Sequence, residues 1–288
     1  MTAAREVKNI VYITDLDGTL LKNDASISIF AENMLNDLIQ EGLLFSVASA
    51  RSVVSIRKML SGLKLKLPVI EFNGAFISDL ETGEHHIINS IEPSVTEPIF
   101  QLINSFQYVP LISTFNGKED CLYYNEISNK GIEWYVDNRV KNQDERLRYL
   151  NSLNDALKDE VVCLTVIGKY GMLSELKYAI SDQFSNSVEL HLMENQYSPG
   201  WYWLTVHDYK ATKDRAIETL LEKYNIKDNY ELVAFGDNDN DIKMLQSADR
   251  AIVVANASDS VKQYATQIIG PNSDDSVAKF IHKEWNRS

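Results

Sequence analysis

Short, uninterrupted apolar runs alternate with amphipathic segments in the first third of the chain and again near its end. An apolar run without polar alternation is typical of a strand that a parallel sheet buries on both faces, whereas apolar residues recurring every three or four positions predict a helix. The expected strands are residues 10–14, 43–48, 68–72, 232–235 and 251–254. The expected helices are residues 30–42, 53–62, 213–224, 259–264 and 276–285, with a further short helix through Met244 and Leu245. This order predicts an α/β fold with a parallel sheet.

Strand and helix signals are mixed between Thr82 and Asp208. The expected strands here are residues 122–124, 161–167 and 201–206, and the expected helices are residues 93–107 and 172–184. No Ser- or Gly-rich linker and no repeat marks this stretch, so it is predicted to be a folded insertion. The sequence therefore predicts a Rossmann-like parallel-sheet core built from residues 1–81 and 209–288, with an α+β domain of residues 82–208 inserted into it.

The net negative charge of the chain argues against some classes of binding partner. The 288 residues carry 28 Lys and Arg against 41 Asp and Glu, a net charge of -13, which argues against non-specific binding to nucleic acid or to an anionic membrane surface. No apolar run is long enough to cross a membrane, and residues 1–9 contain no apolar signal segment. Cys121 and Cys163 are isolated thiols that suit a reducing compartment. We therefore expect a cytoplasmic protein, monomeric or homodimeric, that binds neither nucleic acid nor membrane.

Two carboxylates one residue apart follow the first apolar run. Asp15 and Asp17 share a side-chain direction at a strand end, which places both carboxyls in one crevice. They repel each other there unless a cation or a proton lies between them. A surface turn is the alternative, because Asp and the following Gly18 favour turns, but a turn does not require the apolar strand before it. Open α/β sheets bind ligands at the carboxyl ends of their strands, so this pair is a candidate catalytic centre.

A second group of carboxylates follows another apolar run, in residues 236–241 (GDNDND). A calcium-binding EF-hand loop also has alternating Asp, but it requires a Gly at its sixth position and a Glu at its twelfth. This chain has Ile242 and Ala248 there, which excludes that motif. A solvated acidic turn is the remaining alternative. If these carboxylates lie on a strand next to the first pair, a hard divalent cation offsets their repulsion, and all-oxygen ligands suit Mg²⁺.

Four segments of the chain, taken in order, resemble the motifs of the haloacid dehalogenase (HAD) superfamily of phosphotransferases. They are residues 15–20 (DLDGTL), residues 49–51 (SAR), Lys213 and residues 236–241. The first and fourth motifs are specific, whereas the second and third are weak by themselves. The insertion after residues 73–75 (NGA) is similar to the C2 cap, C2B-like, of the Cof-type subfamily, which includes many sugar-phosphate phosphatases. The chain departs from the family at Ala50 and Asp214, where glycine is common.

The resemblance implies roles for the acidic residues. Asp15 would be the nucleophile that attacks phosphorus and forms an aspartyl-phosphate. Asp17 would protonate the leaving alcohol and then activate water, so its side chain would stay off the metal. Mg²⁺ would be held by the Asp15 carboxylate, the Asp17 main-chain carbonyl and Asp237, with Asp241 close by as a ligand or through water.

The second and third motifs would bind the phosphate. By resemblance, Ser49 would donate a hydroxyl hydrogen bond, and Lys213 would supply a positive charge at a helix start, where the backbone also favours anions. Ser49 is otherwise a strand-end or capping serine, and Lys213 a solvated helix lysine. Lys210 is the alternative to Lys213, which we prefer because Ala216 and the residue after it continue the family's register.

Three further polar residues have two or more interpretations each. Asn240 would contact the phosphate or orient Lys213. Arg51 would orient the substrate, bridge to the cap domain or form a structural salt bridge. Asn73 would face the cavity, although both asparagines could instead bond turn backbone. The pair His85-His86 follows Gly83 without metal-like partners, which predicts a solvated loop.

The combined interpretation is a Mg²⁺-dependent phosphatase that hydrolyses a small phosphorylated metabolite. The resemblance favours a sugar phosphate, with the specificity contacts in the cap domain. One alternative is a phosphomutase of sugar phosphates that uses the same aspartyl-phosphate chemistry. The other is a non-catalytic metabolite-binding protein, although a binding module has no need of Asp17.

Overall fold

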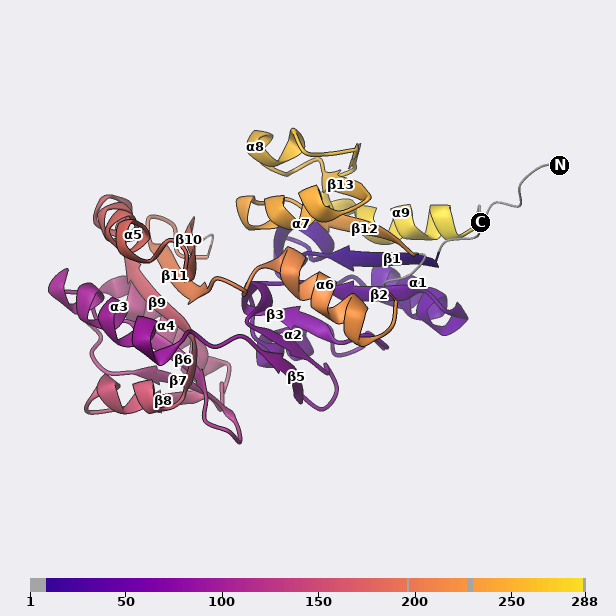
Figure 1. Cartoon of the computed structure of the whole chain (residues 1–288). Helices are drawn as coiled ribbons and strands as arrows, with labels where there is room; N and C mark the ends of the chain where they lie inside the picture. The colour runs from indigo at the N-terminus through magenta and orange to yellow at the C-terminus, as the bar shows by residue number, and fades with distance from the viewer. Residues whose placement is uncertain (1–8, 196, 227–229, 287–288) are drawn as a thin grey trace. The chain divides into compact units, whose positions relative to one another are not determined.

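The computed structural model describes residues 9–195, 197–226 and 230–286. The chain divides into two compact units, residues 1–87 with 212–288, and residues 88–211 (Figure 1). The sequence pattern predicts the insertion at residues 82–208. At the first crossing the first unit continues to residue 87, because strand β5 (His85–Ile88) joins one of its sheets, and at the second crossing it resumes at residue 212.

The first unit is built on a five-stranded parallel sheet, which confirms the expected α/β class. Its strand order is β14-β13-β12-β1-β2, and every pairing is parallel. The expected strands are present, and β14 is an edge strand that the apolar pattern does not reveal. The bounds are β1 (Asn9–Thr14), β2 (Leu44–Val47), β12 (Tyr230–Gly236), β13 (Arg250–Val254) and β14 (Gln267–Ile269).

Helices surround this sheet in Figure 1. Helix α1 begins where the Ser28 hydroxyl accepts a hydrogen bond from the Ala31 N–H, and it ends at Gly42, whose φ of 112° is the left-handed conformation of a helix C-cap. It packs against α9, and α6 packs against α7. The helix bounds are α1 (Ile29–Glu41), α2 (Val53–Met59), α6 (Lys213–Lys223), α7 (Ile242–Ser247), α8 (Asp259–Lys262) and α9 (Ser276–Trp285).

A small three-stranded sheet, β3-β4-β5, extends the core beyond β2. Strand β3 (Val69–Glu71) continues the parallel sheet through one bridge, Ala48 to Ile70, and pairs antiparallel with β4 (Phe76–Ser78). The prediction of a solvated loop at His85-His86 is wrong, because both residues lie in β5. The His85 ring stacks on Phe76 with a centroid distance of 4.0 Å, and its side chain is only 5% exposed.

The second unit is organised around a six-stranded, mostly antiparallel sheet of order β10-β11-β9-β6-β7-β8. Residues of α3 and α5 pack on the sheet in one hydrophobic cluster, and residues of α4 pack on it in another. The strand bounds are β6 (Leu111–Phe115), β7 (Asp120–Tyr124), β8 (Leu147–Tyr149), β9 (Glu160–Gly168), β10 (Val188–Glu194) and β11 (Tyr202–Asp208). The helix bounds are α3 (Pro93–Ser105), α4 (Lys130–Lys141) and α5 (Tyr170–Phe184).

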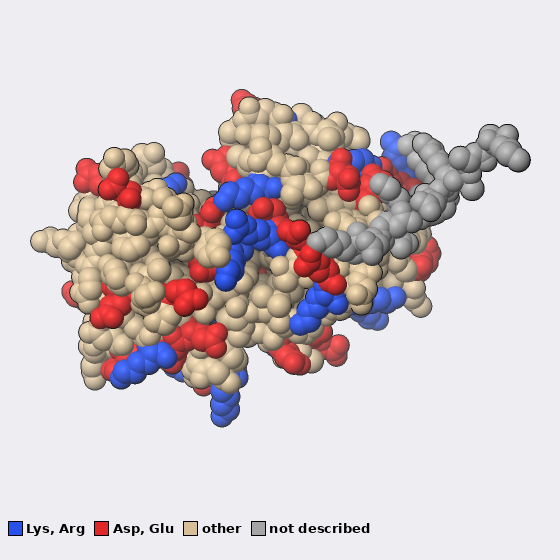
Figure 2. All heavy atoms as spheres, in the orientation of Figure 1, with Lys and Arg blue, Asp and Glu red and all other residues tan. Residues whose placement is uncertain are grey.

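The surface shows charges of both signs. Figure 2 shows Lys and Arg side chains on the visible face in small groups beside acidic ones. Among the described residues, no helix has the length and apolar character needed to cross a membrane.

The second unit contains a buried histidine, His207, and we expect its titration to make the stability of the unit sensitive to acid. His207 is 1% exposed, its Nδ1 lies 3.1 Å from the Val162 carbonyl, and burial and the neighbouring His191 lower its pKa from 6.5 to about 3. Below pH 6.5 the unfolded chain therefore binds a proton that the folded unit does not bind until about pH 3, so stability falls as the pH falls through this range.

We predict that lowering the pH from 7 to 5 costs the wild type about 2 kcal/mol more unfolding free energy than it costs His207→Asn. Asparagine keeps a donor for Val162 but does not titrate. Urea unfolding, followed through the aromatic residues of the second unit at both pH values, measures the difference. Equal losses in the two proteins would show that His207 does not cause the sensitivity.

Candidate active site

The parallel pairing of β1 with β12 brings the two acidic motifs together. Thr14 lies opposite Phe235 in the register, so Asp15 and Asp237 leave neighbouring strands at the same edge of the sheet. The Asp15 N–H donates to the Phe235 carbonyl over 3.0 Å, which fixes the backbone at the first motif. Asp15 is 6% exposed, so its carboxyl group is almost entirely shielded from solvent at the end of β1.

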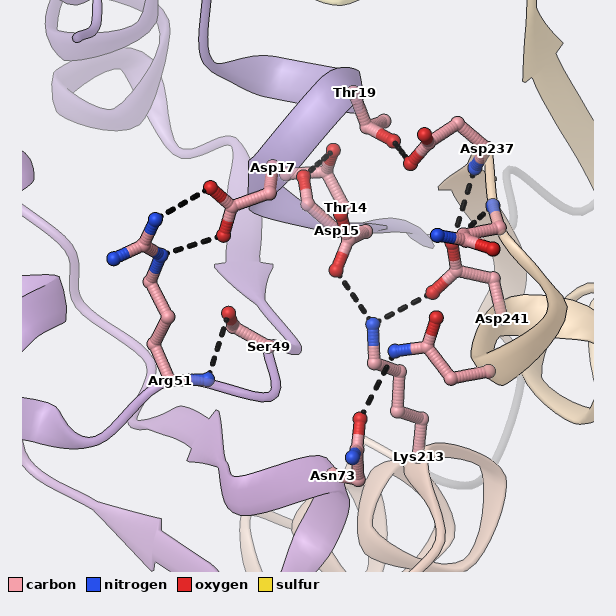
Figure 3. Close-up of polar contacts among 12 residues, drawn as sticks. Thr14, Asp15, Asp17, Thr19, Ser49, Arg51, Asn73, Lys213, Asp237 and Asp241 are labelled. Atoms are coloured by element: carbon pink, nitrogen blue, oxygen red, sulfur yellow. Dashed lines mark hydrogen bonds and ion pairs between the residues drawn. The ribbon is translucent and has the colours of Figure 1, made fainter. Parts of the chain in front are cut away.

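Lys213 lies between two of these carboxylates. It is the first residue of α6, and its Nζ is 2.6 Å from Asp15 Oδ1 and 2.6 Å from Asp241 Oδ1 (Figure 3). Burial lowers the pKa of Lys213, but the charges of the two aspartates outweigh burial and hold the pKa above its ordinary value. The lysine is therefore a permanent cation in the site. The alternative, Lys210, is exposed and lies near the Tyr209 ring.

The carboxylate cluster has an excess of negative charge. One oxygen from each of Asp15, Asp237 and Asp241 lies within 4.8 Å of the others. Burial, followed by repulsion from Asp241, raises the pKa of Asp237 to about 7, and burial also raises that of Asp15 well above its usual range. Lys213 supplies a single positive charge to three carboxyl groups, so the donor set fits a hard divalent cation such as Mg²⁺, which would favour their ionised forms.

The contacts of Asp241 distinguish it from the other two aspartates. Its Oδ1 binds Lys213, and its Oδ2 accepts hydrogen bonds from the N–H groups of Asp237 and Asn238 at 3.0 and 3.1 Å. Both oxygens therefore already have protein partners. Asp241 is well placed to orient Lys213 and the loop, whereas Asp15 and Asp237 are better placed to contact a metal.

Asp17 points away from the cluster and toward Arg51 (Figure 3). The guanidinium holds the carboxylate at two points, Nε to Oδ2 at 2.5 Å and Nη2 to Oδ1 at 2.7 Å. The Asp17 side chain is 29% exposed and that of Arg51 is 23% exposed, so solvent reaches this pair more readily than it reaches Asp15. Of the interpretations that the sequence left open for Arg51, the structure shows the salt bridge, and its partner is the candidate acid and base.

Ser49 lies on the loop that joins β2 to α2. It is 1% exposed, and its Oγ accepts a hydrogen bond from the Arg51 N–H over 3.2 Å, which leaves the hydroxyl hydrogen able to point elsewhere. Asn240 and Asn73 bind each other, with Asn240 Nδ2 donating to Asn73 Oδ1 over 3.0 Å. Their bond joins the two sequence halves of the first unit beside Lys213 (Figure 3).

Two further residues contact the site: Thr19, which belongs to the first motif but for which no role was predicted, and Asn256, which was not predicted at all. Thr19 donates its hydroxyl to Asp237 Oδ1 over 2.8 Å, and Asn256 Nδ2 donates to the Gly18 carbonyl over 2.7 Å. Gly18 has a φ of 79°, and a Cβ there would lie 2.5 Å from Asp237 Oδ2, so only glycine lets the two motifs approach. Asn256 comes just after β13, and the position of polar residues at strand ends could have indicated it.

Comparisons with known proteins identify the family of the chain. A model of the haloacid dehalogenase-like hydrolase family matches residues 12–281. The 5-amino-6-(5-phospho-D-ribitylamino)uracil phosphatase YitU of Bacillus subtilis is 23% identical over 97% of this chain and 98% of its own. The pyridoxal phosphate phosphatase YbhA of Escherichia coli is 24% identical over 94% of this chain and 97% of its own.

Solved structures share the fold. A haloacid dehalogenase-like hydrolase from Bacteroides thetaiotaomicron aligns with a TM-score of 0.75 at 20% identity, covering 96% of this chain and 100% of that one. Another, from B. subtilis, has a TM-score of 0.75 at 21% identity and covers 93% and 98% of the two chains. The chain therefore belongs to the haloacid dehalogenase-like hydrolases, in their Cof-type family, and is a phosphatase.

Proposed function

We propose that this protein is a Mg²⁺-dependent phosphatase that hydrolyses a small phosphate monoester through an aspartyl-phosphate on Asp15. The observation that carries the proposal is the buried contact of Lys213 with Asp15 and Asp241, with Asp237 in the same cluster. Such a cluster can hold both a metal and a phosphoryl group, because its fixed charges are arranged before the substrate arrives.

The residues support a reaction in two steps. Asp15, held at a strand end, would attack phosphorus in line while Asp17 protonates the departing alcohol oxygen. The alcohol then leaves, and Asp17, now a carboxylate, would take a proton from the water that attacks the phosphorus of the aspartyl-phosphate. Lys213 and the Ser49 hydroxyl would bind the phosphoryl oxygens. The products are the free alcohol, inorganic phosphate and regenerated Asp15.

The metal would be held by Asp15 and Asp237 from two neighbouring strands, with the Asp17 carbonyl implied as a third ligand. When bound, Mg²⁺ offsets the charge of the phosphate and so reduces its repulsion from the nucleophile. Thr19 would orient Asp237 for this purpose through its 2.8 Å hydrogen bond.

Among phosphate esters, we propose small phosphorylated metabolites as the substrate class. The names of two relatives refer to a phosphoribityl compound and to pyridoxal phosphate, which are both small polar monoesters. They support a small phosphorylated metabolite here, and a sugar phosphate is our first candidate by resemblance to the Cof-type family. Release of phosphate from a panel of sugar, nucleotide and cofactor phosphates, with Mg²⁺ or with chelator, tests the proposal.

The expected result is selective, chelator-sensitive release. Transfer of phosphate between positions of one sugar, with no free phosphate, would instead indicate a phosphomutase. Equal release with and without chelator would contradict the metal requirement.

Arg51 should matter most when the leaving group is poor. We predict that Arg51→Ala slows alcohol release from an alkyl phosphate by about tenfold in the first turnover, because Asp17 is then no longer held in one orientation. An aryl phosphate, whose phenolate leaves without a proton, should slow by no more than about threefold. Rapid-quench measurement of both substrates checks this. Equal slowing of the two would argue against an effect through Asp17.

A further inference from the structure

A buried carboxylate lies one strand away from the active-site residues and has no part in the mechanism above. Glu71, the last residue of β3, is 0% exposed. Its Oε2 accepts a hydrogen bond from the main-chain N–H of Val53, the first residue of α2, and its Oε1 accepts one from the Ser78 hydroxyl. A buried carboxylate is costly unless it is fully bonded, and an apolar side chain could fill the same space.

Glu71 is held in place from the opposite side. Ser78 Oγ lies 2.7 Å from His85 Nδ1, and that nitrogen lies 3.5 Å from Glu71 Oε1. The His85 ring in turn stacks on Phe76 at 4.0 Å. The carboxylate therefore has one orientation, fixed by β4 and β5.

The segment that follows Glu71 is hydrogen-bonded through its main chain to the active-site loop of residues 49–52. The Phe72 N–H donates to the Arg51 carbonyl over 3.0 Å, and the Asn73 N–H donates to the Ser49 carbonyl over 2.9 Å. Phe72 and Asn73 have φ values of 48° and 56°, in the left-handed region that a bulky residue such as Phe avoids. Backbone in this conformation persists when several contacts fix it, and Glu71 supplies the contact at the start of α2.

We propose that Glu71 is a positioning residue for the phosphatase reaction. Its carboxylate fixes the start of α2, and it thereby holds the loop that presents the Ser49 hydroxyl to the phosphate and the Arg51 guanidinium to Asp17. The inference rests on the proposed function for the roles of Ser49 and Arg51. The restraint that Glu71 places on the loop of residues 49–52, which we call the clamp, does not depend on that function.

The clamp is tested by amide hydrogen exchange, without any substrate. Glu71→Met keeps the size of the side chain but leaves the Val53 N–H without its acceptor, whereas Glu71→Gln keeps an acceptor oxygen. We expect exchange across residues 49–56 to accelerate at least about tenfold in Glu71→Met and less than about threefold in Glu71→Gln. Unchanged exchange in a folded Glu71→Met protein would overturn the proposal, whatever the activity shows.

The positioning role is tested by rapid-quench rates on an alkyl phosphate. Glu71→Met should slow the first turnover about tenfold at saturating substrate, and Glu71→Gln should restore the rate to within about threefold. In an Arg51→Ala background the same Met substitution should cost less than it costs the wild type, because the part of the loss that acts through Arg51 is already present there. A loss of equal size in both backgrounds would make Glu71 structural only and would overturn the role.

A control carboxylate, Asp249, is exposed and directly precedes β13, at the amino ends of the parallel strands. Asp249 also accepts a main-chain N–H, that of Leu232, over 2.8 Å. Asp249→Leu should leave the first-turnover rate within about twofold, and a loss as large as that of Glu71→Met would overturn the proposal. If the wild type released phosphate from no substrate, the proposed function would fail. The exchange measurement would still show whether Glu71 restrains the loop.

Discussion

Replacing Asp15 by Asn is expected to lower kcat for phosphate release by about 10⁴-fold or more. The amide has the shape of the carboxylate but is not a nucleophile toward phosphorus. Asp15 is 6% exposed and its carboxylate lies 2.6 Å from Lys213. The nearby carboxylate of Asp241 is bonded to the same lysine, so it could replace the nucleophile only by leaving that bond. Steady-state release from the best substrate of the panel measures the effect.

The Asn variant should remain folded and should still bind phosphate. Lys213 keeps its second partner, Asp241, at 2.6 Å, and the amide oxygen can accept from the lysine. An unchanged circular dichroism spectrum and retained binding of an inert phosphate analogue would confine the defect to the chemical step. Activity within about tenfold of the wild type would rule out Asp15 as the nucleophile.

Replacing Lys213 by Met is expected to impair both stability and rate. The lysine side chain is 0% exposed and sits between Asp15 and Asp241, so its removal leaves buried carboxylates without their cation. Such a loss typically costs about 3 kcal/mol in unfolding free energy, and removal of a charge that faces the transition state lowers kcat by about 10²–10³-fold. Urea unfolding in chelator and steady-state kinetics in Mg²⁺ measure the two effects.

The neighbouring Lys210→Met is the matched control. Lys210 is exposed and near the Tyr209 ring, so its loss should change stability by less than about 0.5 kcal/mol and kcat by less than about twofold. Added Mg²⁺ should recover part of the stability of Lys213→Met, because a cation then returns to the cluster. Equal effects of the two substitutions would contradict the central position of Lys213.

The sequence predicted the elements whose pattern is strong. The apolar runs before Asp15 and Asp237 mark strands β1 and β12 to within two residues, and their parallel pairing joins the two acidic motifs. The helical face that starts at Lys213 likewise appears as α6. These features follow from local burial, which periodicity records directly.

Other features depend on contacts that no local pattern records. Strand β5 contains His85-His86, a pair whose polarity predicts a loop. The strand is stabilised by a contact from elsewhere in the chain, because the His85 ring stacks on Phe76. Helix α4 escaped prediction because it places only a few apolar residues against the sheet. The pairing of Arg51 with Asp17 spans 34 positions, and the bond from Glu71 to Val53 spans 18, so neither has a signature in spacing.

The covalent intermediate is the central claim, and trapping it is the most direct test. Asp17→Asn should still accept the phosphoryl group from an aryl phosphate but should hydrolyse the aspartyl-phosphate slowly, because the base is missing. Acid quenching, reduction of the acyl phosphate with borohydride and peptide mass spectrometry should find homoserine at position 15. Rapid phosphate release with residue 15 unmodified, or modification at a different carboxylate, would contradict the account.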